Sequence, residues 1–106
     1  MTVADRIRAE VGSWDGVTVE AHRFGGVEFR LGRRELGHLH GDRIADLPFT
    51  RALRDELVAA GRARRHHVLP DSGWVTCSLE DADEAIALFR FSYERALRAA
   101  ARSGRS

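Results

Sequence analysis

The sequence predicts an α+β domain in which a single, mainly antiparallel sheet of about five strands carries helices on one face. Several short segments alternate apolar and polar residues between glycine-containing turns, which is typical of β-hairpins. Other segments repeat apolar residues at steps of three and four, which is typical of amphipathic helices. Because hairpins pair antiparallel and helices must bury their apolar sides, we expect the order α-β-β-β-α-β-β-α.

The first predicted element is a helix over residues 2–12, because Thr2 can cap it and aliphatic side chains recur on one side. Residues 17–22 and 27–31 then alternate apolar and polar side chains. This period of two predicts two half-buried strands.

The Gly32-Arg33 loop predicts how the next strand pairs, because glycine readily takes the positive φ of a type II′ turn. A two-residue loop places Val27 opposite His38, and paired residues share a face. We therefore expect His38 and His40 to point with Val27 and Phe29 toward the covered side of the sheet. A loop longer by one residue would turn both histidines outward.

Five further segments complete the predicted order. An apolar stretch at 44–47 follows a turn, and a helix is predicted over about 50–60. A short strand is predicted at 67–69 and another at 74–79, separated by a Pro-Asp-Ser-Gly turn. The last helix, over 81–101, has a long apolar stripe on which we expect the sheet and Trp74 to pack.

Length and composition fit one globular domain. The chain has 106 residues, of which 43% are hydrophobic and 31% charged. We predict a single domain over residues 1–101 and a frayed tail over 102–106. The net charge of +1 gives no strong signal for a nucleic-acid partner or a membrane, although all 17 basic residues are arginine.

The sequence also predicts a cytoplasmic protein. Cys77 is the only cysteine, so no internal disulfide can form. The first residues are charged where a signal peptide needs an apolar run, and no stretch reaches the length of a membrane span. The sequence does not indicate an oligomeric state.

His38 and His40 are the most informative candidates for chemistry. Side chains two residues apart on a strand share a face about 7 Å apart at Cα, a workable spacing for two ligands of one divalent metal. His66, His67 or Asp46 could supply the third ligand. The plainer interpretation is a pair of partly buried histidines that hydrogen-bond to the backbone or to acidic neighbours.

Without a metal, two imidazoles in a cleft could hold a polar ligand or transfer protons near neutral pH, with Glu28 or Glu35 as partners. Cys77 alternates in phase with apolar neighbours, which predicts a buried thiol rather than a nucleophile. The glycines have no flavin or nicotinamide motif spacing.

The segment Glu35–His40 resembles the luciferase-domain family of small proteins, whose activity is not established. Further likeness lies in the segments Ile44–Phe49, Glu56–Ala63, His66–Pro70, Ser72–Val75 and Ala85–Tyr93. The resemblance runs from about Val17 to Leu97 and implies that His38, His40 and His66 are family-like positions. If a metal binds, we therefore expect His66 to be the third ligand. It does not imply light emission here, since the chain is far too short for the barrel of bacterial-type luciferases.

A weaker similarity relates Trp74 and the Ser92-Tyr93 pair to small double-wing proteins once proposed to bind DNA. The lysine-rich wing expected for DNA contact is missing, so nucleic acid is not an expected partner.

Two functional hypotheses remain, with DNA binding third. The first is a module that binds a small molecule in a pocket lined by His38, His40, His66, Trp74 and Phe29. The second is an enzyme in which His38, His40 and His66 or His67 bind a metal or move protons. The sequence does not decide whether the protein is an enzyme.

Overall fold

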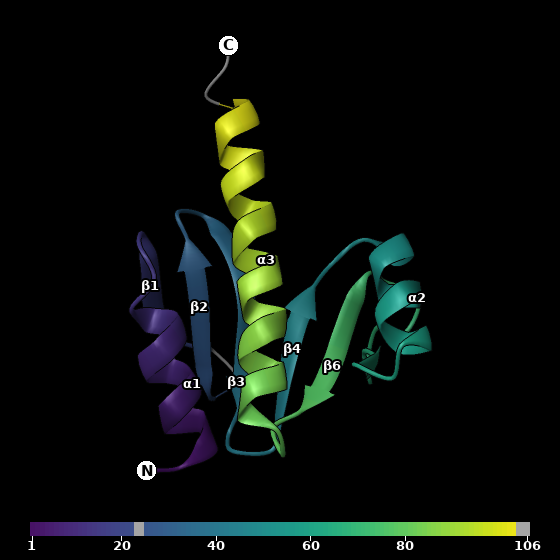
Figure 1. The fold of residues 1–106 in the computed structure, drawn as a ribbon, viewed down its shortest axis with the longest axis horizontal. Coiled ribbons are helices and arrows are strands. Elements are labelled where there is room, and N and C mark those ends of the chain that lie inside the picture. The colour runs from purple at the N-terminus through teal and green to yellow at the C-terminus, as the bar shows by residue number, and fades with distance from the viewer. Residues whose placement is uncertain (23–24, 104–106) are drawn as a thin grey trace.

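The structure, a computed structural model, describes residues 1–22 and 25–103. This part of the chain forms three helices and one antiparallel sheet of six strands in the spatial order β1-β2-β3-β4-β6-β5 (Figure 1). The elements are α1 (Val3–Gly12), β1 (Val17–Ala21), β2 (Val27–Leu31), β3 (Arg34–His40), β4 (Ile44–Pro48), α2 (Arg51–Ala59), β5 (Arg64–Arg65), β6 (Trp74–Ser78) and α3 (Ala82–Ser103). The predicted fold class is confirmed, with six strands in place of about five.

The two longer helices cover the same face of the sheet. Figure 1 shows α3 lying across β3 and β4 and α1 lying beside it over β1 and β2, with α2 at the far end near β6. Phe29 of β2 and Phe89 of α3 are fully buried, and their ring centroids are 5.2 Å apart. No helix in the described ranges is both long and apolar enough to span a membrane.

The predicted helix starts are confirmed by their caps. Thr2 and Asp5 form a reciprocal capping box at α1. The hydroxyl of Thr50 accepts the backbone N–H of Leu53 at α2. Asp81 accepts two backbone N–H groups of the first turn of α3. That helix extends two residues beyond its predicted end, and residues 104–106 of the predicted tail lie outside the described residues.

The hairpin of β2 and β3 contains a β-bulge that the loop length does not predict. Leu31 pairs with Arg34, as the two-residue loop requires, but Phe29 pairs with Gly37. Leu36 is therefore an extra residue on β3. An extra residue reverses the face to which the following side chains point.

The predicted orientation of the histidines is consequently wrong. His38 pairs with Glu28 and not with Val27, so His38 and His40 point away from the face that α3 covers. Phe29 stays on the covered face, and it does not share a pocket with the histidines as the sequence analysis expected.

Two residues fit the bulge into the core. The extra residue, Leu36, is fully buried, and its carbonyl accepts a hydrogen bond from the buried hydroxyl of Ser92 at 2.8 Å. Gly37 has a φ of +150°, and a Cβ there would lie 2.7 Å from Phe89 and 2.8 Å from the carbonyl oxygen of Asp46. Position 37 therefore requires glycine in this conformation.

The predicted strand over 67–69 is also wrong, because the paired residues there are Arg64 and Arg65. The backbone N–H groups of Val68 and Leu69 donate to Nδ1 of His66, at 3.1 and 3.0 Å, instead of to a strand. This local turn fixes the ring of His66.

Candidate metal centre

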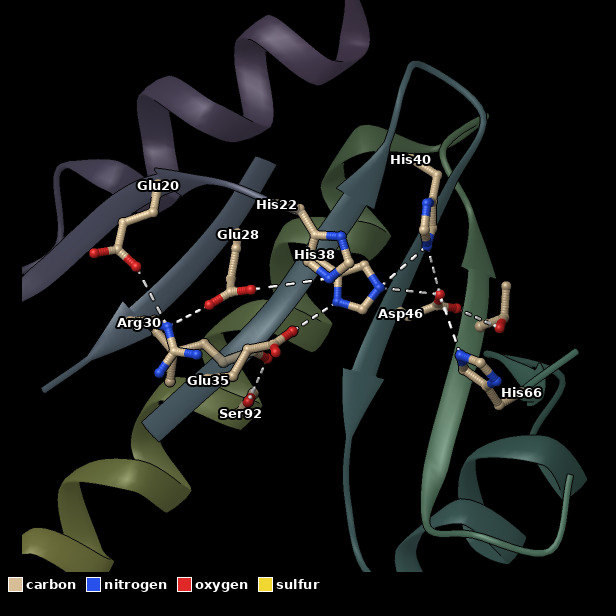
Figure 2. Close-up of polar contacts among 12 residues, drawn as sticks. Glu20, His22, Glu28, Arg30, Glu35, His38, His40, Asp46, His66 and Ser92 are labelled. Carbon is tan, nitrogen blue, oxygen red and sulfur yellow. Dashed lines mark hydrogen bonds and ion pairs between the residues drawn. The ribbon is translucent and has the colours of Figure 1, made fainter. Parts of the chain in front are cut away.

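All five histidines of the chain gather on the uncovered face of the sheet. Four of them have Nε2 within 3.6 Å of Oδ2 of Asp46, and the fifth, His22, stacks on the ring of His38. Figure 2 labels four of the five beside Asp46. Two come from β3, two follow β5 and one follows β1. They are His38, His40, His66, His67 and His22. Segments far apart in the sequence therefore supply one cluster of imidazoles.

His38, His40 and Asp46 form a compact triangle of potential metal ligands. Oδ2 of Asp46 lies 2.9 Å from Nε2 of His40 and 3.3 Å from Nε2 of His38, and the two nitrogens are 3.1 Å apart. Metal–ligand bonds of about 2.0–2.1 Å separate neighbouring donor atoms by roughly 3.0–3.4 Å. The triangle therefore has the dimensions of one face of a metal coordination shell.

The pairing of β3 with β4 positions these three side chains. His38 lies directly opposite Asp46, and His40 lies two residues further along the same strand. Cross-strand partners and residues two apart share a face. The bulge at Leu36 turns this face away from α3.

Asp46 is fully buried and is held in place by Thr76, whose hydroxyl donates to Oδ1 at 2.5 Å. Burial alone would raise the pKa of the Asp46 carboxyl, but hydrogen bonds from His38 and Thr76 outweigh it and hold the pKa far below its usual range. The carboxylate is therefore ionised, with Oδ2 directed at the imidazoles.

His38 bridges two carboxylates. Its Nδ1 lies 2.6 Å from Oε2 of Glu35, on the side opposite Asp46. Burial alone would lower the pKa of His38, but its contacts with Asp46 and Glu35 outweigh burial and raise the pKa to about 9. A histidine that ligates a metal commonly donates its other ring N–H to a carboxylate, which is the position of Glu35.

His66 also reaches Asp46, with Nε2 3.3 Å from Oδ2. It differs from His38 in its protonation, because of the hydrogen bonds that its ring makes. Nδ1 accepts two backbone N–H groups, so that nitrogen carries no proton. Burial, the largest effect, lowers the pKa of His66, which keeps the ring neutral. A neutral imidazole has one N–H, so Nε2 carries it and donates toward Asp46.

His67, Trp74 and His22 pack around the triangle of His38, His40 and Asp46. His67 stacks on His66 and is half exposed, with Nε2 3.6 Å from Oδ2 of Asp46. The Trp74 ring lies 5.6 Å from the His38 ring, on the uncovered face. The expectation that Trp74 packs against the last helix is therefore wrong. His22 stacks on His38 at 4.2 Å between centroids.

The structure brings together every residue that the sequence analysis singled out for a site, except Phe29. His22 and Thr76 also belong to the site, although no pattern in the sequence marks either of them. Asp46 was only one of three alternatives, yet an acidic residue inside the apolar run Ile44–Leu47 is a signal of a buried, partnered carboxylate.

The fold and this cluster define a small α+β domain with a histidine–aspartate centre on the open face of its sheet. The family model described as the Luciferase domain matches residues 33–92, which is more than half of the chain and includes His38, His40, Asp46 and His66. The chain belongs to this luciferase-domain family. The comparisons found no match among curated proteins and none among solved structures.

Proposed function

We propose that the protein is a small ligand-binding module whose histidine-lined pocket binds a divalent transition metal through His38, His40 and Asp46. The observation that carries this proposal is the triangle of donor atoms with edges of 2.9–3.3 Å. The carboxylate of Glu35 behind His38 supports it, because such partners orient metal-ligating imidazoles.

A cavity of about 470 Å³ beside the triangle supports the binding of a small molecule. Its lining consists of His22, Glu35, His38, His40, Asp46, His66, His67, Val68, Leu69 and Trp74. The volume lies in the range of small-molecule sites, which is about 300–1,000 Å³. Trp74 and the exposed aliphatic side chains supply apolar contact, while the imidazoles supply polar contact.

The chemistry of the donors favours zinc, iron, cobalt or nickel over magnesium or calcium, because two of the three are imidazoles. Two imidazoles and one carboxylate on one face leave coordination positions open for water or a ligand. His66 is not in the proposed set, because its Nε2 carries a proton while Nδ1 accepts backbone N–H groups. It serves instead as a hydrogen-bond donor that orients Asp46.

A second candidate function is a metal-dependent enzyme. His67 is half exposed beside Asp46 and could accept a proton from a metal-bound water. A zinc-bound water ionises near neutral pH, which would provide a hydroxide for attack on a substrate. This function rests on the same metal centre and adds His67 as the base.

The proposal is tested by titrating the metal-free protein with Zn²⁺ and Co²⁺ by calorimetry, with the visible absorption of Co²⁺ as a second readout. We expect one ion per chain, and His38→Gln and His40→Gln should each weaken binding at least ~100-fold while circular dichroism stays unchanged. Glu10→Gln is the control, because Glu10 is exposed on α1, on the other side of the sheet, and it should change affinity by less than about threefold.

The variant His66→Gln separates two ligand sets. Affinity within about tenfold of wild type fits the proposed set, because only an orienting hydrogen bond is lost. A loss as large as that of His38→Gln would make His66 the third ligand. A folded wild-type protein that binds neither Zn²⁺ nor Co²⁺ would contradict the proposed function.

A further inference from the structure

A second cavity, of about 600 Å³, lies on the same face of the sheet as the metal centre. It is lined by His40, Arg43, Ile44, Arg64, Ser78 and Glu80. His40 lines both cavities, so the second cavity adjoins the proposed metal centre.

The strand register places Arg64 in line with the centre. One row of paired residues crosses β3, β4, β6 and β5, and it consists of His38, Asp46, Thr76 and Arg64. Adjacent strands are about 4.8 Å apart, so the Cα atoms of Asp46 and Arg64 are separated by roughly 10 Å. Because paired residues share a face, Arg64 points to the same side as Asp46.

Arg43 and Arg64 are exposed, and neither forms an ion pair within the described ranges. Two nearby arginines differ, because Arg62 pairs with an acidic residue of α3 and Arg65 lies near two carboxylates. Glu80 is the carboxylate of the cavity lining, and its backbone N–H donates to Ser78. The lining therefore contains two positively charged guanidinium groups and one negatively charged carboxylate, which gives the cavity a net positive charge.

We propose that Arg43 and Arg64 form a subsite for an oxyanion, a phosphate or a carboxylate, carried by the small molecule that binds at the metal. Guanidinium groups present a planar fork of donors that matches both oxyanions. One end of the ligand then occupies an open metal position, and the anionic end lies between the arginines. That the other end of the ligand binds the metal rests on the proposed function, whereas the arginine subsite does not.

The test measures the binding of phenyl phosphate and of benzoate by calorimetry, with both metal-free and Zn²⁺-loaded protein. The two probes share a ring and differ in the oxyanion, so their relative affinity identifies which one the subsite takes. The variants are Arg43→Gln and Arg64→Gln. Arg98→Gln is the matched control, because Arg98 is exposed on α3.

Each cavity variant should weaken binding of the preferred probe about tenfold in both forms of the protein, since a charge-assisted contact is lost. The control should bind as wild type does, and Glu80→Gln should bind more tightly because a competing carboxylate is removed. Zn²⁺ affinity should be unchanged in all of these variants.

Absence of probe binding in both forms, or equal affinity of wild type and the two cavity variants, would overturn the subsite. If Zn²⁺ does not bind but the metal-free protein still binds a probe through both arginines, the subsite is supported and only the metal centre fails. The two proposals are therefore separately testable.

Discussion

Glu35 and His38 lie three residues apart on β3, yet their side chains share one face and meet at 2.6 Å between Oε2 and Nδ1. On a regular strand, residues three apart point to opposite faces. The extra residue at Leu36 removes this difference. An irregularity in the sheet thus creates the contact that orients the first proposed metal ligand (Figure 2).

The variant Glu35→Gln tests the role of this contact. It removes the carboxylate behind His38 while keeping the size of the side chain, so Zn²⁺ affinity should fall about 10- to 100-fold. Glu20→Gln, on the same face at β1, is the control and should leave the affinity unchanged. A Glu35→Gln protein with wild-type Zn²⁺ affinity in calorimetry would show that Glu35 does not support the centre.

Gly37→Ala tests the bulge itself. A Cβ at this position meets Phe89 and the carbonyl oxygen of Asp46 at under 3 Å, so the free energy of unfolding should fall by about 3 kcal/mol. Gly32→Ala is the matched control, because Gly32 also has a positive φ but has no atom within 4 Å of the added Cβ. It should cost only about 1–2 kcal/mol in urea unfolding. Equal losses would mean that the close packing at Gly37 is unimportant.

Ser92→Ala tests the hydrogen bond that satisfies the carbonyl of Leu36 in the bulge. Loss of a donor to a buried acceptor costs about 1–3 kcal/mol, and urea unfolding should show a loss of that size. Ser13→Ala removes an exposed hydroxyl that donates to a backbone carbonyl, and it should cost less than about 0.5 kcal/mol. If the two variants lose the same stability, the bulge does not depend on Ser92.

The pKa of His38 predicts how the metal-free protein responds to pH. Because folding raises this pKa from 6.5 to about 9, the charged ring stabilises the fold fully below about pH 6.5, and this stability is lost as the pH rises through about 9. Because the pKa of Asp46 is lowered, its carboxylate stabilises the fold at all but acidic pH. Protonation in acid removes that contribution to the free energy of unfolding. Urea unfolding across the alkaline range should show the decline in wild type and not in His38→Gln.

The affinity for Zn²⁺ should change with pH in the direction opposite to the stability of the metal-free protein. A metal at Nε2 displaces the proton of His38, so Zn²⁺ binding should tighten as the pH rises toward about 9. Calorimetry in buffers of different ionisation enthalpy would detect the released proton. Binding that is independent of pH in this range would mean that His38 is not a ligand.

Local signals predicted much of this fold. Thr2, Thr50 and Asp81 cap helices where the sequence placed them, because a cap depends on residues within one turn. The register of β3 could not be read from loop length alone, since the loop is as predicted and the bulge lies beyond it. Gly37 was the available signal, because a glycine inside a strand often marks a bulge.

The site was predicted less completely than the fold. His38 and His40 stood out because they are two apart, but which third group lies beside them depends on long-range strand pairing. Asp46 is adjacent through β4, and His66 reaches it only because a local turn orients its ring. His22 has no spacing that relates it to the others, so only the structure places it in the cluster.

Anomalous diffraction from crystals of the protein grown with Zn²⁺ would locate the metal and identify its ligands. We expect one anomalous peak about 2.0–2.2 Å from Nε2 of His38, Nε2 of His40 and Oδ2 of Asp46, with Nδ1 of His66 still accepting its backbone hydrogen bonds. A peak held by His66 and His67 instead, or no peak on this face of the sheet, would contradict the proposed metal centre.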